Sequence, residues 1–164
     1  MAHSNIRKFR LQDNAAVKLL VTSIMNKEFP HDALAYPPDD LDDIPGHYGN
    51  IGEAFFVAED DKGNLIGTIA VKRDDERHAL LRRFFVSPEY RGKNVGKALL
   101  EHLIGFCREV GYQEIIVKTT TRMERAIKIC RDYGFAEKAR IDLGATELCK
   151  LALFLRENSP LASQ

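Results

Sequence analysis

Apolar residues recur along this chain at two different spacings, and each spacing predicts one kind of element. From Ala16 to Met25 they recur every three or four positions, as in a helix with one buried face. The same spacing predicts a second helix over residues 94–110 and a third that ends near Gly134. Shorter apolar runs between turn residues predict strands over residues 6–9, 54–59, 65–72, 79–86, 114–118, 135–141 and 147–155.

Two of these helices begin with a capping signal. Asp13 lies just before the first apolar stripe and can cap the helix that follows. Thr121 and Glu124 match the capping box of the third helix. Residues 29–52, between the first helix and the next strand, contain four prolines, which predicts a loop with one short helix near residues 39–44.

The predicted elements form hairpins in the middle of the chain and strand–helix units in its second half. This order predicts an α/β (α+β) fold, in which a mixed, mostly antiparallel central sheet of about six to seven strands carries helices on both faces. We expect a single domain over residues 1–155 and a polar C-terminal tail over residues 156–164.

Composition and charge narrow the range of partners. The 164 residues contain 24 Lys and Arg and 24 Asp and Glu, so no long-range basic field would attract nucleic acid or a membrane surface. The three cysteines (Cys107, Cys130 and Cys149) lack CxxC and zinc-site spacing, so we expect no metal site, and their odd number suits a reducing compartment. Because no apolar segment has signal-peptide or membrane-spanning length, we expect a soluble, cytoplasmic protein.

The segment from Phe85 to Leu100 carries the clearest chemical signal, a strand followed by a Gly- and Lys-containing turn and a helix. Free N–H groups at a helix start, together with the helix dipole, bind anions. Gly92 and Gly96 let a phosphate approach the backbone closely. Three basic side chains add positive charge around them: Arg91, Lys93 and Lys97. These features predict a site for a diphosphate, although an ordinary helix start with surface lysines is the alternative.

The glycine spacing disfavours two common nucleotide sites. A nucleotide-triphosphate loop needs four residues between its glycines, and Ser or Thr after its Lys. Here three residues separate Gly92 from Gly96, and Ala98 follows Lys97. The dinucleotide fingerprint G-x-G-x-x-G is absent as well.

Residues 86–100 instead resemble the pyrophosphate loop of the GNAT superfamily of acetyl-CoA-dependent N-acetyltransferases. That pattern is Arg or Gln, two residues, Gly, one residue, then Gly or Ala, and Arg91, Asn94 and Gly96 occupy its defining positions. Asn94 replaces the usual Gly, but Asn tolerates a left-handed backbone better than most residues, so we expect the loop shape to be kept. Residues 126–135 resemble the second signature of the family, and the element order agrees over about residues 6–154.

The resemblance implies a GNAT-like fold with acetyl-CoA as co-substrate, in which two neighbouring parallel strands splay apart. Backbone groups of Phe84 and Val86 would then pair with the pantetheine arm, and a strand N–H near Phe85 would stabilise the developing oxyanion. The pyrophosphate would bind the backbone of the loop formed by Arg91, Gly92, Lys93, Asn94, Val95, Gly96 and Lys97.

The sequence departs from the family at the proton donor, a Tyr near the middle of the second signature helix. That position is Cys130 here, and the Asn often found seven residues earlier is Met123. Cys130 is either a thiol that protonates the leaving thiolate or a small core residue, and we favour the core residue. Tyr133, one turn later, is a substitute donor or a packing residue.

No general base stands out. Glu76 and His78 begin the strand before the loop, and His47 and Tyr48 lie in the proline-rich segment. Each of these is more often a surface residue than a catalyst. Direct attack by an amine that has lost its proton locally is equally consistent with the sequence.

Three residues are candidates for binding the acceptor: Arg83, Tyr36 and Tyr48. Arg82 and Arg83 are adjacent in a predicted central strand, and Arg83 either binds a substrate carboxylate or forms a structural ion pair. We expect residues 29–52 to wall the acceptor pocket through Tyr36 and Tyr48. Four aspartates in this segment would attract a cationic amine or simply solvate a short helix: Asp39, Asp40, Asp42 and Asp43.

These features predict an N-acetyltransferase that transfers the acetyl group of acetyl-CoA to a primary amine of a small molecule or protein by direct attack, with a small molecule or a peptide as the acceptor. The alternative is a non-catalytic acyl-CoA-binding or regulatory module on the same fold, which the departures at Met123 and Cys130 keep open. A homodimer is compatible with either function.

Overall fold

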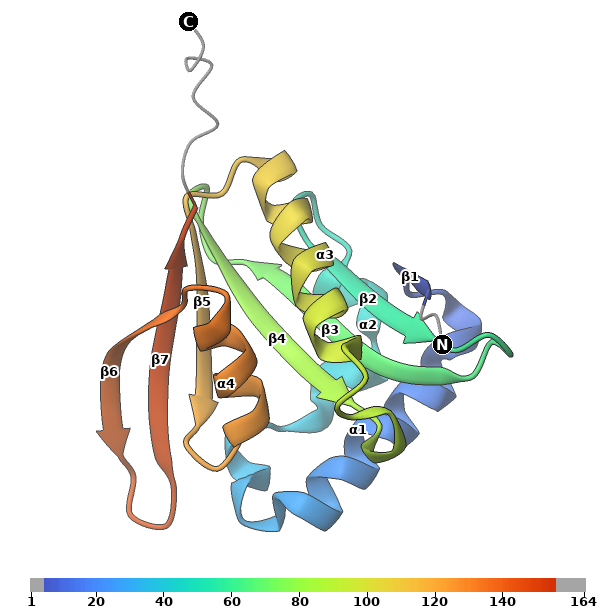
Figure 1. Ribbon diagram of the computed structural model, residues 1–164, viewed down its shortest axis with the longest axis horizontal. Coiled ribbons are helices and arrows are strands. Elements are labelled where there is room, and N and C mark those ends of the chain that lie inside the picture. Colours follow the sequence, from blue (N-terminus) through green and yellow to red (C-terminus); the bar gives the residue numbers. More distant parts are fainter. Residues whose placement is uncertain (1–4, 156–164) are drawn as a thin grey trace, which may run out of the picture.

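A computed structural model describes residues 5–155, apart from the side chains of residues 33–35. Within these residues, seven strands form one sheet in the order β1-β2-β3-β4-β5-β7-β6 (Figure 1). The strands are β1 Asn5–Lys8, β2 Ala54–Glu59, β3 Leu65–Arg73, β4 His78–Val86, β5 Glu114–Thr120, β6 Ala136–Asp142 and β7 Glu147–Phe154. Neighbouring strands are antiparallel except β4 and β5, which are parallel. The predicted mixed, mostly antiparallel sheet is therefore confirmed, whereas the predicted tail lies outside the described residues.

Helices cover both faces of this sheet, as the apolar stripes predict. The helices are α1 Asn14–Glu28, α2 Ile44–Tyr48, α3 Val95–Val110 and α4 Glu124–Asp132. Leu99 and Leu103 of α3 are buried with Phe56 on one face, on which α4 also lies. Val17 and Val21 of α1 are buried on the opposite face with Val57, Ala70 and two residues of α2, Ile44 and Tyr48. Figure 1 shows α3 and α4 in front of the sheet and α1 behind it.

The predicted capping box at the third helix is wrong. α4 begins at Glu124, its N-cap residue is Met123, and no side chain caps it. The backbone N–H of Thr121 donates to the carbonyl of Glu147 in the neighbouring strand at 2.9 Å. Thr121 therefore still belongs to the end of the β5–β7 ladder, and the helix starts only after a turn.

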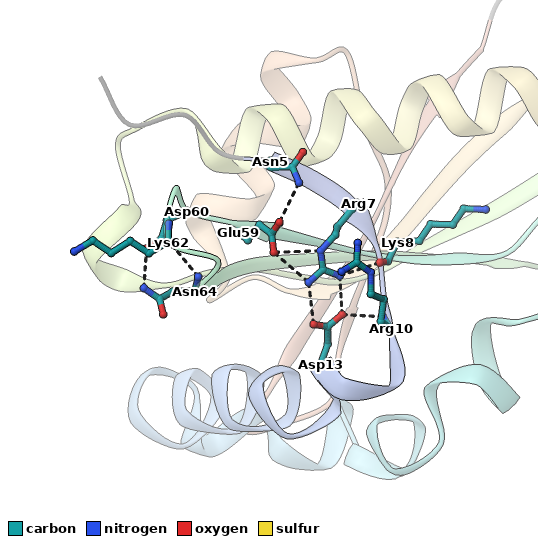
Figure 2. Close-up of polar contacts among 9 residues, drawn as sticks. All are labelled: Asn5, Arg7, Lys8, Arg10, Asp13, Glu59, Asp60, Lys62 and Asn64. Atoms are coloured by element: carbon teal, nitrogen blue, oxygen red, sulfur yellow. Dashed lines mark hydrogen bonds and ion pairs between the residues drawn. The ribbon is translucent and has the colours of Figure 1, made fainter.

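Asp13 occupies the expected N-cap position of α1, but its carboxylate does not cap the helix. It accepts two hydrogen bonds from the guanidinium of Arg7 at 2.8 and 2.9 Å, and one from the backbone N–H of Arg10 (Figure 2). The same guanidinium contacts Glu59 of β2. A charge-assisted bidentate pair is stronger than a single bond to a helix N–H, so the carboxylate fastens β1 to α1 instead.

The proline-rich segment contains more regular structure than the sequence predicts. It forms two 3₁₀ helices, Pro30–Ala35 and Pro38–Asp42, followed by α2. Two of its aspartates, Asp32 and Asp40, are buried. Among residues 5–155, no helix combines the length and the apolar composition needed to cross a bilayer.

Candidate active site

β4 and β5 separate from each other in the middle of the sheet. In the described chain they pair over three residues, His78–Leu80 with Glu114–Ile116. β4 then continues along β3 to Val86, and β5 continues along β7 to Thr120. Figure 1 shows the two strands diverging toward their carboxyl ends.

Two cavities adjoin at this divergence. The first, of about 280 Å³, lies between β4 and β5 and is lined by residues 80–85 and 116–119, by one face of α4 and by Tyr36. The second, of about 690 Å³, lies against the amino-terminal end of α3 and the turn before it. They share four lining residues: Phe84, Phe85, Met123 and Ala126. Together the two cavities form a passage from the surface at α3 into the middle of the sheet.

A bulge in β4 shapes the wall between these cavities. Thr68 pairs with Phe85 and Ala70 with Arg82, so β4 has one residue more than β3 across this stretch. Arg83 has a positive φ of 52°, an uncommon conformation for a residue with a side chain. The Thr68 hydroxyl donates to the Arg83 carbonyl at 2.7 Å and so holds the bulge in place.

Arg83 forms a buried ion pair. Its Nε donates to Asp40 Oδ2 at 2.9 Å, and its Nη2 donates to Asp40 Oδ1 and to the Pro37 carbonyl. The Tyr48 hydroxyl donates to the same carboxylate at 2.6 Å. Burial raises the pKa of Asp40, but the hydrogen bonds from Arg83 and Tyr48 outweigh it, so the pKa lies below its ordinary value. Of the two roles considered for Arg83, the structure contains the ion pair.

The proline-rich segment also fastens to β5. Asp32 accepts hydrogen bonds from the Thr120 hydroxyl at 2.9 Å and from Arg122 at 2.7 Å. The Tyr36 hydroxyl donates to Thr119 Oγ1 and accepts from the Thr120 N–H, both at 2.9 Å. This segment therefore bridges the two diverging strands, through Asp32 and Tyr36 to β5 and through Asp40 to β4.

The two acceptor-side tyrosines have different positions. Tyr36 lines the cavity between β4 and β5, as expected for a residue that walls a pocket. Tyr48 is buried against Phe55 and lines neither cavity. Burial and the neighbouring Asp40 carboxylate raise the pKa of Tyr48, so its hydroxyl stays protonated and supports the ion pair.

The loop before α3 has the backbone that the sequence predicts. Asn94 is left-handed, with a φ of 67°, and immediately precedes the helix. Gly92 also has a positive φ, of 77°, and open space lies where its Cβ would be. Gly96 serves packing instead, because a Cβ there would lie 2.8 Å from Cδ1 of Ile129 on α4. The residues of this loop therefore have different roles: residues 92 and 94 adopt a left-handed backbone, and residue 96 allows close contact between α3 and α4.

The basic side chains of the loop are only partly available. Arg91 makes a bidentate pair with Glu28 at the end of α1, with both distances 2.8 Å. The Lys93 amino group lies 5.3 Å from the centre of the Tyr90 ring. Lys97 is exposed at the first turn of α3. Nothing in the sequence signals the partnership of Glu28, which comes from the packing of α1 beside the loop.

The candidate proton donors lie in different places. Cys130 lines the cavity between β4 and β5, and burial raises the pKa of its thiol to about 12. Tyr133 lines neither cavity, and its hydroxyl donates to Glu101 of α3, which raises the pKa of Tyr133 to about 12. His78 pairs with Asp75, and neither His78 nor Glu76 lines a cavity. Within residues 5–155, no group of three or more His, Cys, Asp or Glu side chains is arranged to hold a metal ion.

Comparison with known proteins agrees with this geometry. Residues 19–135 match the model of the Acetyltransferase (GNAT) family. Rat N-acetyltransferase family 8 member 2 is 30% identical over 121 residues, which are 70% of this chain and 53% of that protein. The chain spans about half the length of the mammalian relatives that it matches.

Solved structures share the fold over nearly the whole chain. A GNAT-family acetyltransferase from Staphylococcus aureus is 27% identical, has a TM-score of 0.81, and covers 94% of this chain and 100% of that one. A GNAT phosphinothricin acetyltransferase from Sinorhizobium meliloti, solved with acetyl-CoA, is 22% identical with a TM-score of 0.74, and covers 94% of this chain and 89% of that one. From its family match and its fold, this chain belongs to the GNAT family of acetyltransferases.

Proposed function

We propose that this protein is an N-acetyltransferase that moves the acetyl group of acetyl-CoA to a primary amine by direct attack. The observation that carries the proposal is the passage formed by the two adjoining cavities. One end is the amino-terminal end of a helix, which suits an anionic group, and the other is a narrow space between two strands. A donor with a diphosphate at one end and a thioester at the other fits such a passage, and membership of the GNAT family supports acetyl transfer.

The diphosphate would bind at the start of α3. The N–H groups of Val95, Gly96 and Lys97 belong to the first turn, which has no side-chain cap. Phosphate oxygens would accept from these groups, with the helix dipole adding to the attraction. The pair between Arg91 and Glu28 would hold the turn in place, while Lys93 and Lys97 supply positive charge.

The thioester would lie beside the bulge of β4. The backbone of Phe84 and Val86 would pair with the pantetheine arm, since this edge of β4 has no strand partner beyond Leu80 in the described chain. A backbone N–H near Phe85 would donate to the carbonyl oxygen as negative charge develops on it. Tyr36 would wall the acceptor side of the same space.

The chemical step is a simple addition and elimination. The neutral amine attacks the thioester carbon, the carbonyl oxygen takes the negative charge, and collapse breaks the carbon–sulfur bond to release the CoA thiolate. The extra proton on nitrogen passes to water. A thiol with a pKa of about 12 is a poor donor to a thiolate whose conjugate acid has a pKa of ~8.5, so the step as proposed uses no dedicated acid.

A pair of substitutions at Asn94 tests the donor site. Asn94→Asp keeps the size and the left-handed tolerance of the residue but adds a negative charge beside the proposed diphosphate. We expect acetyl-CoA to bind at least roughly tenfold more weakly by calorimetry, with an unchanged melting temperature. Asn94→Gly, the residue usual in the family, should bind like the parent. Equal affinity in all three proteins would place the donor elsewhere.

An acceptor panel tests the reaction itself. Amino acids, polyamines, aminoglycosides and peptides are offered with acetyl-CoA, and free thiol is measured as the product. Thiol release that depends on an amine supports acetyl transfer. Binding of acetyl-CoA without thiol release in any mixture would favour the alternative, a non-catalytic acyl-CoA-binding module.

A further inference from the structure

The residues that line the cavity between β4 and β5 include basic but no acidic ones. Arg82 and Arg83 come from β4 and Lys118 from β5, and no Asp or Glu is among the lining residues. The aspartates of the proline-rich segment therefore do not give this cavity the negative field that would attract a polycation. Asp40, which is buried, is already paired with Arg83.

The charges around this cavity sum to a positive excess. Arg83 and Asp40 neutralise each other, and the buried Asp32 is paired with Arg122. Burial raises the pKa of Asp40, and Arg83, Tyr48 and the charge of Arg82 lower it, yet both oxygens of Asp40 already accept hydrogen bonds from Arg83. Arg82 and Lys118 thus remain as two charges without a matching acid among the side chains that the structure describes.

The register of β5 and β7 adds a third cation. Lys118 is directly opposite Lys150 in the antiparallel ladder. Like charges at opposed positions destabilise a sheet. Neither lysine makes an ion pair with any side chain described between residues 5 and 155, whereas the nearby Glu147 is paired with Arg140. An anion held between the strands would relieve this repulsion.

We propose that the amine acceptor carries a carboxylate, which Arg82 and Lys118 bind at the mouth of the cavity while the amine points toward Phe84 and Phe85. The inference rests on the acetyl-transfer function proposed above and names its substrate class. Arg82 and Lys118 line the same cavity as Phe84 and Phe85, one on each of the two strands that flank it. An amino acid or a related amino carboxylate fits this arrangement, and a polyamine or an aminoglycoside does not.

Matched pairs of acceptors isolate the carboxylate. Each amino acid is compared with its own carboxamide, which has the same shape and amine but no negative charge. With thiol release as the readout, kcat/KM for the amino acid should exceed that for the carboxamide by roughly tenfold or more, since both cations would lose a charged partner. In parallel, calorimetry with CoA present should show the N-acetylated amino acid binding more tightly than its carboxamide.

Substitutions then assign the effect to these two side chains. Arg82→Gln and the exposed Lys118→Gln should each raise KM for the amino acid roughly tenfold, with kcat and acetyl-CoA affinity nearly unchanged. Neither should alter the kinetics of the carboxamide. Arg82→Lys should restore part of the affinity. Lys62→Gln is the control, because Lys62 lies in the turn between β2 and β3 and its side chain points away from the molecule (Figure 2).

The outcomes separate this inference from the proposed function. Equal rates with an amino acid and its carboxamide, or unchanged acceptor kinetics in both variants, would overturn the carboxylate site while acetyl transfer stands. If acetyl-CoA binds but none of the amines causes thiol release, acetyl transfer is overturned and the acceptor site with it. A preference for carboxylates that disappears in the Arg82 and Lys118 variants supports both.

Discussion

Cys130 illustrates how burial decides what a single residue can do. It is at the position where the family often has its proton donor, and it lines the cavity between β4 and β5. It is also almost completely buried, within the cluster that contains Leu151 and Phe135. Removing a thiol from water disfavours the thiolate and raises its pKa to about 12. Such a thiol packs well in the core but is a weak acid.

We therefore expect Cys130→Ala to change kcat by less than about threefold and to lower the free energy of unfolding by about 1 kcal/mol. Steady-state kinetics and urea denaturation measure the two effects. Cys107→Ala is the matched control, because Cys107 is equally buried in α3 but lines neither cavity. A loss of roughly a hundredfold in kcat for Cys130→Ala alone, with normal stability, would identify it as the acid.

At the scale of elements, the site depends on a strand that is held out of regular geometry. The bulge at Arg83 is fixed from two sides, by the Thr68 hydroxyl on β3 and by the Asp40 carboxylate on the segment that bridges β4 and β5. A left-handed backbone at a residue with a side chain costs about 1–3 kcal/mol and persists where its surroundings enforce it. These contacts are well placed to aim the backbone of Phe84 and Phe85 into the cavity.

Thr68→Val tests this arrangement, because it replaces the buried hydroxyl by a methyl group of similar size. The Arg83 carbonyl would lose its partner, so we expect a stability loss of about 1–3 kcal/mol. If the bulge orients the oxyanion-stabilising N–H, kcat should also fall about tenfold or more, with little change in acetyl-CoA affinity. Thr68→Ser keeps the hydroxyl and should keep kcat. A Val variant with the parental kcat would show that the bulge is structural alone.

At the scale of the whole molecule, the buried thiols make stability sensitive to alkaline pH. Burial raises the pKa of Cys107 and of Cys130 to about 12, from an ordinary value of 9.0. In the unfolded chain both thiols ionise above pH 9, whereas in the folded chain they resist ionisation. Their contribution to stability is therefore complete below about pH 9 and is lost as the pH rises toward 12.

The free energy of unfolding should accordingly fall between pH 9 and pH 11, by at most about 1.4 kcal/mol per pH unit for each thiol. Urea denaturation at a series of pH values measures this slope. The variant with Cys107→Ala and Cys130→Ala starts from a lower stability but should lose less of it over the same range. Parallel pH profiles for the two proteins would contradict the assignment to these thiols.

Most of the helices and strands, and the backbone of the turn before α3, could be predicted from the sequence. The apolar spacings predict α1, α3 and each strand of the sheet to within a few residues. The tolerance of Asn for a left-handed backbone predicts the conformation observed at Asn94. These features are local, because each depends on residues that lie within one or two turns of each other along the chain.

The tertiary structure alone decided which of the polar residues meet. Arg83 and Asp40 are 43 residues apart in the chain, and Tyr36 and Thr119 are 83 apart. Thr121 does not cap a helix because it still pairs with Glu147 of β7, a strand later in the chain, and α4 begins only at Glu124. A sequence pattern indicates the conformation and the kind of partner that a side chain favours. Which of several competing partners it meets depends on strand register and on where the proline-rich segment crosses the sheet. For this reason the sequence predicts a donor site, but only the tertiary structure shows that Arg83 is paired with Asp40 while the neighbouring Arg82 is not.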